Sequence, residues 1–389
     1  MISAALYFAF CEAVKELIRG SVKFNWRFRM KISKKVWLSA LAGIVLASGV
    51  SAQSITLTNI FGGDADNLYS SDFITLTKDN DGKLNKGNVN VADRLQLDFK
   101  GDKILGRVRL EAKTGTVNGK LATADKTFSN GSDIRIRGFV GFNPWEFLTI
   151  AGGNKFFTKY SLSAAYLAAS DDQESHGNLL DTNGAGVIFN IAGLKIAGGV
   201  AAESRLNLNL AASYDIKDVV SLGFTFQDVT TEAFSFAGYA GLNAVEDLIL
   251  NVGYIYNHEG GYLASAEQAV QFSAGYTFKD IGLTLLGDFQ TGLSKKSAKD
   301  KEGGYTEYDR VPLYTKVVAG ISPLDNLDVS LAFTLTDEST GAVGYSFYPY
   351  IDYDTGLGTI RTGARFNFKD SDFSGIDIPL SWTYKFKIK

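Results

Sequence analysis

The chain has 389 residues, of which 45% are hydrophobic and 13% aromatic, and its formal net charge at pH 7 is −3. Its single cysteine, Cys11, excludes a disulfide framework and a zinc site with several cysteine ligands. Five prolines against 41 glycines fit a continuous hydrogen-bonded sheet, because proline would interrupt the ladder.

The first 52 residues have the pattern of a secretory signal. Met30 is followed by three lysines, an apolar run over residues 36–47, and small residues that end in Ser51-Ala52. The run is shorter than the roughly 18 to 20 residues that a spanning helix needs. We therefore expect cleavage after Ala52, with residues 1–29 an over-long start, residues 30–52 the signal peptide and residues 53–389 the mature chain.

Removal of residues 1–52 makes the chain more acidic. These residues hold eight of the 39 basic and two of the 42 acidic side chains, which leaves 31 against 40 and a net charge of −9. A nucleic-acid partner is not expected at this charge, because phosphate binding needs clustered lysine and arginine. The mature chain would also have no cysteine, which suits an oxidising compartment.

From about residue 93 onward, apolar and polar residues alternate with a period of two. In the last segment Leu380, Trp382, Tyr384, Phe386 and Ile388 alternate with Ser381, Thr383, Lys385, Lys387 and Lys389. The pattern recurs at residues 206–214, 220–227, 270–278 and 329–335. Strands of about nine to eleven residues are long enough to cross a bilayer when tilted. A sheet with one apolar face and no helices to cover it must meet lipid.

The connections alternate in length. Short ones occur at residues 101–102, 143–145, 192–193, 215–218, 243–247, 279–280 and 323–326, and longer polar ones at 62–90, 114–130, 154–183 and 292–309. This asymmetry is typical of transmembrane barrels, which have tight periplasmic turns and long outer loops. The sequence therefore predicts an all-β, antiparallel transmembrane β-barrel of 16–18 strands in a bacterial outer membrane. The strand count is open at residues 54–77 and 345–368.

Aromatic residues near the short connections are expected to form the inner girdle, with their rings at the level of the lipid headgroups. They are Phe142, Trp145, Tyr214, Phe278, Phe366 and Phe368.

The alternation places a basic group on the polar face of a few strands. Its members are Arg94, Arg107, Arg109, Lys113, Arg135 and Arg137 near the N-terminus, and Arg361 and Arg365 near the C-terminus. Charge on the lipid face would cost about 2 to 4 kcal/mol per arginine at mid-bilayer. We expect these residues to form one basic arc in the lumen, because barrel closure joins the terminal strands. A second interpretation is that they only fill a wet wall and pair with Asp98, Glu111 and Asp133.

The connection at residues 154–183 is unusual for an outer loop. Its first half is apolar, and the acidic residues Asp171, Asp172 and Glu174 follow. We expect it to fold into the barrel mouth, where these carboxylates would face the arginines and create a transverse field.

In these features the chain resembles the general-porin family of Gram-negative outer membranes. The resemblance implies that Asp171, Asp172 and Glu174 form the acidic side of an eyelet, and that Arg94, Arg107, Arg109, Arg135 and Arg137 form its basic side. It also implies a homotrimer. The chain departs from the family at its end, where Phe386-Lys387-Ile388-Lys389 replaces the usual terminal phenylalanine. The sequence also has a general look similar to spirochaetal barrels.

The sequence favours a passive porin for small hydrophilic solutes, embedded in outer-membrane lipid and without cofactor or metal. A surface adhesin or structural barrel with a closed lumen is the main alternative, with its activity in loops 62–90 and 292–309. A transporter of apolar solutes is disfavoured by the polar lining. Catalysis is not expected, because His176 and His258 both lie in loop-like sequence, and neighbouring side chains such as Ser175 and His176 face opposite ways on a strand.

Overall fold

The computed structural model describes most of the chain beyond residue 51. The described ranges are 52–63, 72–78, 81–84, 88–117, 120–121, 133–154, 169, 184–202, 206–242, 244–258, 263–300, 302–339, 341 and 343–387. The proposed leader, 1–52, and the carboxylates Asp171, Asp172 and Glu174 therefore lie outside these ranges, except for Ala52 itself. Within them, no helix has the length and apolar character that crossing a membrane requires.

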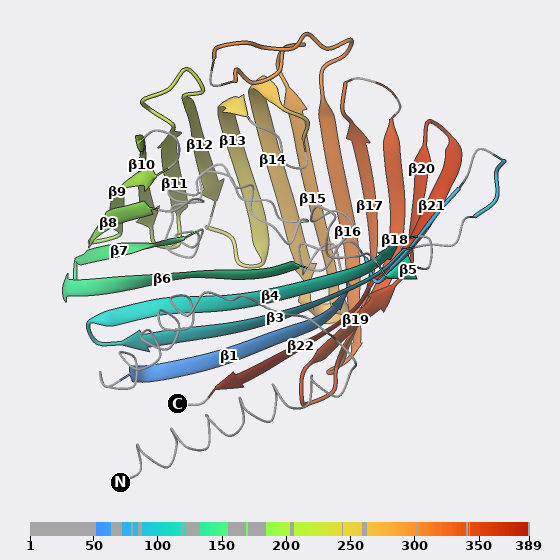
Figure 1. Ribbon diagram of the computed structural model, residues 1–389, viewed down its shortest axis with the longest axis horizontal. Helices are drawn as coiled ribbons and strands as arrows, with labels where there is room; N and C mark the ends of the chain where they lie inside the picture. The colour runs from blue at the N-terminus through green and yellow to red at the C-terminus, as the bar shows by residue number, and fades with distance from the viewer. Residues whose placement is uncertain are drawn as a thin grey trace.

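The chain folds into a closed antiparallel β-barrel of 18 strands (Figure 1). The strand segments are β1 (Ala52–Gly63), β2 (Ile74–Thr77), β3 (Asn88–Gly101), β4 (Ile104–Val117), β5 (Lys120–Leu121), β6 (Asp133–Trp145), β7 (Leu148–Asn154), β8 (Gly184–Ile191), β9 (Leu194–Ala202), β10 (Leu206–Ile216), β11 (Val220–Gln227), β12 (Ser235–Leu242), β13 (Leu248–His258), β14 (Ala266–Phe278), β15 (Leu283–Gly292), β16 (Leu313–Leu324), β17 (Leu327–Asp337), β18 (Gly344–Asp354), β19 (Thr359–Gly363), β20 (Arg365–Lys369), β21 (Asp372–Ile378) and β22 (Leu380–Lys387). A short 3-10 helix, η1 (Lys279–Ile281), joins β14 to β15.

Pairing between the ends of the chain closes the barrel. β1 pairs with β22 on one side and with β3 on the other, with Thr58 opposite Lys385 and Gln96. β2 pairs with β21 and β3, so β1 and β2 occupy one barrel strand. The same holds for β5 with β6, which both pair with the same side of β4, for β19 with β20, and for β21 with β22, so the 22 segments form 18 barrel strands. This arrangement resolves the two ambiguous regions of the sequence.

Proline explains the break between β19 and β20. Pro349 lies within β18, and the pairing of β18 with its neighbour is interrupted beside it, between the pairs Tyr350–Gly363 and Phe347–Phe366, without a change of register. The Ala364 N–H still donates to the Pro349 carbonyl at 3.1 Å. Because proline has no N–H of its own, the ladder loses a bond there and the partner strand is interrupted.

The two faces of the wall have opposite character. The outward side chains of Phe224, Phe272 and Leu331 are 53%, 52% and 51% exposed. Their inward neighbours are polar and buried, as with Thr225, Gln271 and Ser273 at 2%, 2% and 1%. A soluble protein buries its apolar residues instead, so this inside-out pattern is that of a barrel with an apolar outer band and a polar interior.

Several connections differ in place from the prediction. Asn143 and Pro144 belong to β6, and the turn follows them, between Trp145 and Leu148. A further turn, residues 355–358, was not predicted.

The girdle prediction was wrong for Phe366 and Phe368, whereas Phe142, Trp145, Tyr214 and Phe278 do lie beside short turns and are exposed. Phe366 and Phe368 pair with the start of β18, at the end of the barrel that carries the long loops. The link after them is short, residues 370–371, so link length alone does not mark the side of the barrel.

Candidate functional site

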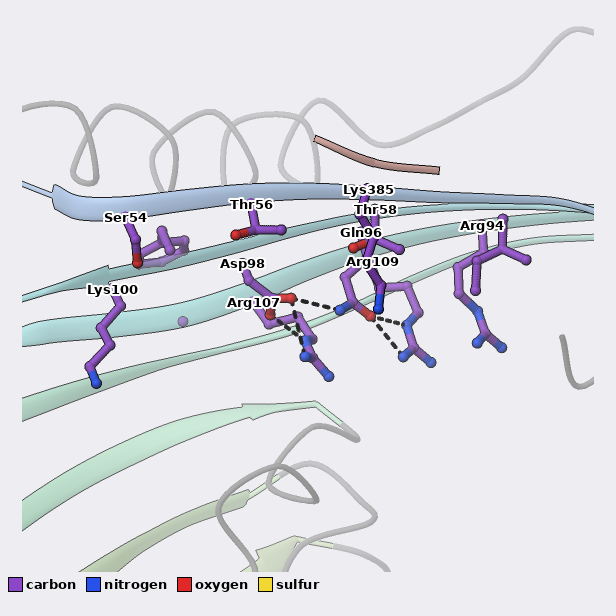
Figure 2. Close-up of a pocket in the computed structure, with 13 residues that line it drawn as sticks. Ser54, Thr56, Thr58, Arg94, Gln96, Asp98, Lys100, Arg107, Arg109 and Lys385 are labelled. Carbon is purple, nitrogen blue, oxygen red and sulfur yellow. Dashed lines mark hydrogen bonds and ion pairs between the residues drawn. The ribbon is translucent and has the colours of Figure 1, made fainter. Parts of the chain in front are cut away.

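A recess of about 710 Å³ opens on the inner face of β1, β3, β4 and β22 (Figure 2). Its wall is formed by Ser54, Thr56, Thr58, Ile60, Arg94, Gln96, Asp98, Phe99, Lys100, Gly106, Arg107, Arg109 and Lys385. Five of these residues are basic and one is acidic. The recess is therefore positively charged, with hydroxyl groups along its β1 side.

The register of β3 and β4 places donors directly opposite acceptors. Three cross-strand pairs follow one another, namely Arg94 with Glu111, Gln96 with Arg109, and Asp98 with Arg107. The Arg94 Nε lies 2.7 Å from Glu111 Oε1, and the Arg107 Nε lies 2.5 Å from Asp98 Oδ1. Directly opposed residues on one sheet face are close enough to bond, so the register alone selects these partners.

Gln96 joins the pairs into one network. Its Oε1 accepts hydrogen bonds from Arg109 Nε at 3.0 Å and Nη2 at 2.8 Å. Its Nε2 donates to Asp98 Oδ2 at 2.7 Å, and Asp98 in turn accepts from Arg107. Figure 2 shows these bonds as a continuous row along the wall. The arginines are thus held at fixed positions, which preorganises the positive field.

Glu111 is the shared carboxylate of the cluster. It is 5% exposed, and beside Arg94 it faces Arg109 Nη1 at 3.6 Å and Arg137 Nε at 3.7 Å. Counting Arg137 and Glu111 with the recess wall gives six basic groups and two carboxylates, an excess of four positive charges. One carboxylate offsets part of the repulsion between three guanidinium groups, and the remaining charge faces the lumen.

Lys100 and Lys385 are the accessible cations of the recess. Both side chains are exposed, and neither has an ion-pair partner among the residues that the structure describes. The sequence pattern had placed Lys385 on the polar face of the last strand but had not assigned it to a site. Its position beside β3 and β4 depends on the closure register, which no local pattern reveals. Lys100 had no signal beyond its place in the alternation before a turn.

The predicted basic arc divides into two groups. Arg94, Arg107 and Arg109 line the recess, and Arg137 approaches it through Glu111. The backbone of Arg135 lies in β6 opposite Glu111, but the side chains of Lys113, Asp133 and Arg135 fall outside the described part of the structure.

Arg361 and Arg365 form the second group, on β19 and β20. The barrel strands of β1 and β22 separate it from β3. Arg361 binds Asp352 with Nε and Nη2 at 2.7 and 2.8 Å, and Arg365 Nη1 lies 3.0 Å from Asp72 Oδ2. Their guanidinium groups also stack over Tyr350 at 4.9 Å and Tyr348 at 4.6 Å. Paired carboxylates and aromatic rings hold both arginines against the wall.

The predicted inward loop is described at one residue, Ala169. Its backbone N–H donates to Asp288 Oδ2 of β15 at 2.9 Å. Ala169 is buried against Val318, Ala332 and Tyr348, which belong to β16, β17 and β18. At this point the loop contacts the inner wall. The predicted acidic residues Asp171, Asp172 and Glu174 lie outside the described residues, so their role opposite the arginines stays a prediction.

The strands within residues 206–336 line the lumen mainly with neutral side chains, and Asp288 and Lys316 are charged exceptions. The two residues are directly opposed on β15 and β16 and are 3% and 9% exposed. Other buried inner residues of these strands are neutral, including Asn209, Ser235, Asn257 and Gln290. No group of His, Cys, Asp and Glu within the described residues has the arrangement of a metal site.

Comparison with known proteins identifies the fold. No protein-family model and no curated protein match the sequence. The outer-membrane protein OpdK from Pseudomonas aeruginosa matches with a TM-score of 0.52 and 12% identity, over 86% of this chain and 99% of that one. A structure of OpdK with vanillate matches equally. A BenF-like porin from Pseudomonas fluorescens Pf-5 has the same score and identity, over 87% and 99%. At this identity, the similarity shows a porin-type barrel fold.

Proposed function

We propose that this protein is an outer-membrane diffusion channel for small hydrophilic solutes and ions, and that its basic recess favours anions. The observation that carries the proposal is the excess of positive charge on one inner wall of a closed barrel whose outer surface is apolar. Fixed charge lining a narrow passage raises the local concentration of the opposite ion and lowers that of the like ion. Passage needs no cofactor, and we propose no catalytic activity.

Carboxylates are the anions that the recess suits best. The recess has the guanidinium groups of Arg107 and Arg109 and the accessible ammonium groups of Lys100 and Lys385. On the neighbouring strand β1, Thr56 and Thr58 add hydroxyl groups. The Nε and Nη2 groups of Arg107 and Arg109 already bond to Asp98 and Gln96, so these guanidinium groups attract a carboxylate through their charge, and the ammonium and hydroxyl groups donate the hydrogen bonds. The match to OpdK, which has been crystallised with vanillate, supports testing an aromatic carboxylate first.

Planar-bilayer recording tests the channel. The protein, refolded into detergent, should produce discrete conductance steps, and a KCl gradient should give a reversal potential of the sign for chloride preference. Vanillate added to one side should cause brief blockades. Absence of steps in several detergents would contradict the channel, whereas steps with cation preference would contradict only the role of the recess.

We further propose that the chain is exported by residues 30–52 and cleaved after Ala52. Mass spectrometry of the protein extracted from outer membranes should give a mature N-terminus at Gln53. Material that starts before Met30 would show that residues 1–29 are part of the product.

A surface-binding role is the second candidate, and the ordered loop between β15 and β16 favours it. Asp300 Oδ1 accepts N–H groups from Glu302 and Gly304, and Lys296 lies 4.8 Å above the Tyr305 ring. Tyr305 is 51% exposed. Replacing residues 295–308 with a short glycine-serine linker should abolish any binding to host or envelope components and leave conductance unchanged.

A further inference from the structure

Gln96 lies at the centre of a row of inward side chains that crosses five neighbouring strand segments. The residues directly opposite one another in this row are Lys385 of β22, Thr58 of β1, Gln96 of β3, Arg109 of β4 and Arg137 of β6. Three of them are cations and none is a carboxylate. The positive charge of the wall is therefore concentrated at the level of Gln96.

The neighbouring row on either side contains a carboxylate opposite an arginine. In one row Glu111 lies 2.7 Å from Arg94, and in the other row Asp98 bonds to Arg107. Directly opposed residues of opposite charge stabilise a sheet, so a glutamate at position 96 would continue the pattern. The neutral side chain of Gln96 is what distinguishes the middle row from its two neighbours.

The hydrogen bonds of Gln96 explain why its position holds an amide (Figure 2). Its Oε1 accepts from Arg109 at 3.0 and 2.8 Å, and its Nε2 donates to Asp98 Oδ2 at 2.7 Å. A glutamate would accept the bonds from Arg109 but would bring a second negative oxygen against Asp98. A lysine would bond to Asp98 but would repel Arg109. Among side chains of this length, an amide bonds to both neighbours.

The amide also affects what a solute meets in the recess. Asp98 directs both carboxylate oxygens into the wall, because Oδ1 accepts from Arg107 Nε and Oδ2 accepts from Arg107 Nη2 and Gln96 Nε2. Gln96 lines the recess and is 9% exposed. Its second Nε2 N–H has no partner among the described residues. Gln96 therefore contributes a hydrogen-bond donor where a glutamate would contribute a negative charge.

We propose that Gln96 is a specificity-determining residue of the recess, which makes the middle row selective for anions. The inference rests on the proposed channel function and assigns a large part of its selectivity to one position. The energy between two charges falls with their distance and is larger where little water screens them. A carboxylate at position 96 would lie among three cations and offset part of their field at the point where it acts on a passing ion.

Gln96→Glu tests the inference, because it adds one negative charge and keeps the length of the side chain. In a KCl gradient, the ratio of chloride to potassium permeability should fall several-fold. Gln271→Glu is the matched control, since Gln271 is also an amide of the inner wall, 2% exposed and bonded to Gln290. It adds the same charge to the mainly neutral wall and should change the ratio far less. Equal shifts in the two variants, or an unchanged ratio in Gln96→Glu, would overturn the proposal.

Labelling of a cysteine adds the charge after the barrel has folded. In a Cys11→Ser background, reconstituted Gln96→Cys is treated with a methanethiosulfonate reagent that carries either a sulfonate or a trimethylammonium group. The sulfonate should lower the ratio of chloride to potassium permeability, and the trimethylammonium group should raise it. The same labels at Gln271→Cys should have little effect. If both labels change the ratio at position 96 in the same direction, the size of the side chain acts there and the proposal is wrong.

The outcomes distinguish this inference from the proposed channel. A cysteine at position 96 that does not react would contradict contact between this residue and solutes in the recess. A wild-type protein without conductance would contradict the channel itself. An anion-selective wild type whose selectivity survives Gln96→Glu would contradict the role of Gln96 alone.

Discussion

The walls formed by β3 and β4 and by β10 to β14 have the same alternating pattern but different interiors. On β3 and β4 the inner positions hold arginines, carboxylates and Gln96 in one bonded row. On β10 to β14 they hold neutral groups such as Asn209, Thr225 and Ser273. Alternation determines only which residues face inward. The identity of those residues decides whether a wall carries a field or merely tolerates water.

The largest expected effect comes from the carboxylate at the centre of the charged wall. Glu111→Gln should reduce the free energy of unfolding by about 3 kcal/mol, because Arg94, Arg109 and Arg137 would lose their shared counter-charge. Urea unfolding of the protein in lipid vesicles measures this. Ser235→Ala, a buried inner substitution on the neutral wall, should cost less than about 1 kcal/mol. Equal costs would mean that the two walls do not differ energetically.

Asp288 is a charged residue of β15, on the otherwise mainly neutral side of the barrel, and it accepts the hydrogen bond that binds the loop at Ala169. Asp288→Ala should reduce the free energy that holds Ala169 against the wall by about 1 to 3 kcal/mol, because the Ala169 N–H loses its acceptor. Single-channel recording should then show a noisier open current. Gln290→Ala removes a bond between two wall residues, Gln290 and Gln271, and should leave the noise at the wild-type level. If the noise of the open current in Asp288→Ala equals that of the wild type, the contact between Asp288 and Ala169 does not control the passage.

Charge reversal at Lys100 and Lys385 tests whether the positive charge of the recess determines the ion selectivity. Lys100→Glu with Lys385→Glu should shift the permeability ratio several-fold toward cations, because the excess of four charges becomes zero. Reversal potential in a KCl gradient measures the shift. Lys217→Glu, on an exposed turn between β10 and β11, should change it far less. If Lys217→Glu shifts the permeability ratio by a similar amount, charge outside the recess and not the recess itself determines the selectivity.

The smallest effect is expected outside both walls, at the turn that holds Lys279. Hydrogen bonds from its ammonium group to Asp247 and Glu246 raise the pKa of Lys279. A raised lysine pKa contributes stability below the unfolded value, about 10.4, that is lost as the pH rises through the folded pKa. Because the side chain is exposed, Lys279→Met should leave the melting temperature unchanged from pH 6 to 9. A clear drop at pH 7 would show that the turn contributes more than exposed pairs usually do.

Sequence reasoning found the barrel, a range of 16–18 strands that includes the observed 18, and the inward direction of Arg94, Arg107 and Arg109, because side-chain direction along a strand follows from a period of two. It could not assign Lys385 to the site or separate Arg361 and Arg365 from the other arginines. Those outcomes depend on register across strands that are distant in sequence, such as Thr58 with Lys385 and Arg361 with Ser381. Register is a property of closure, since each strand aligns with two neighbours at once, and no single segment contains that information.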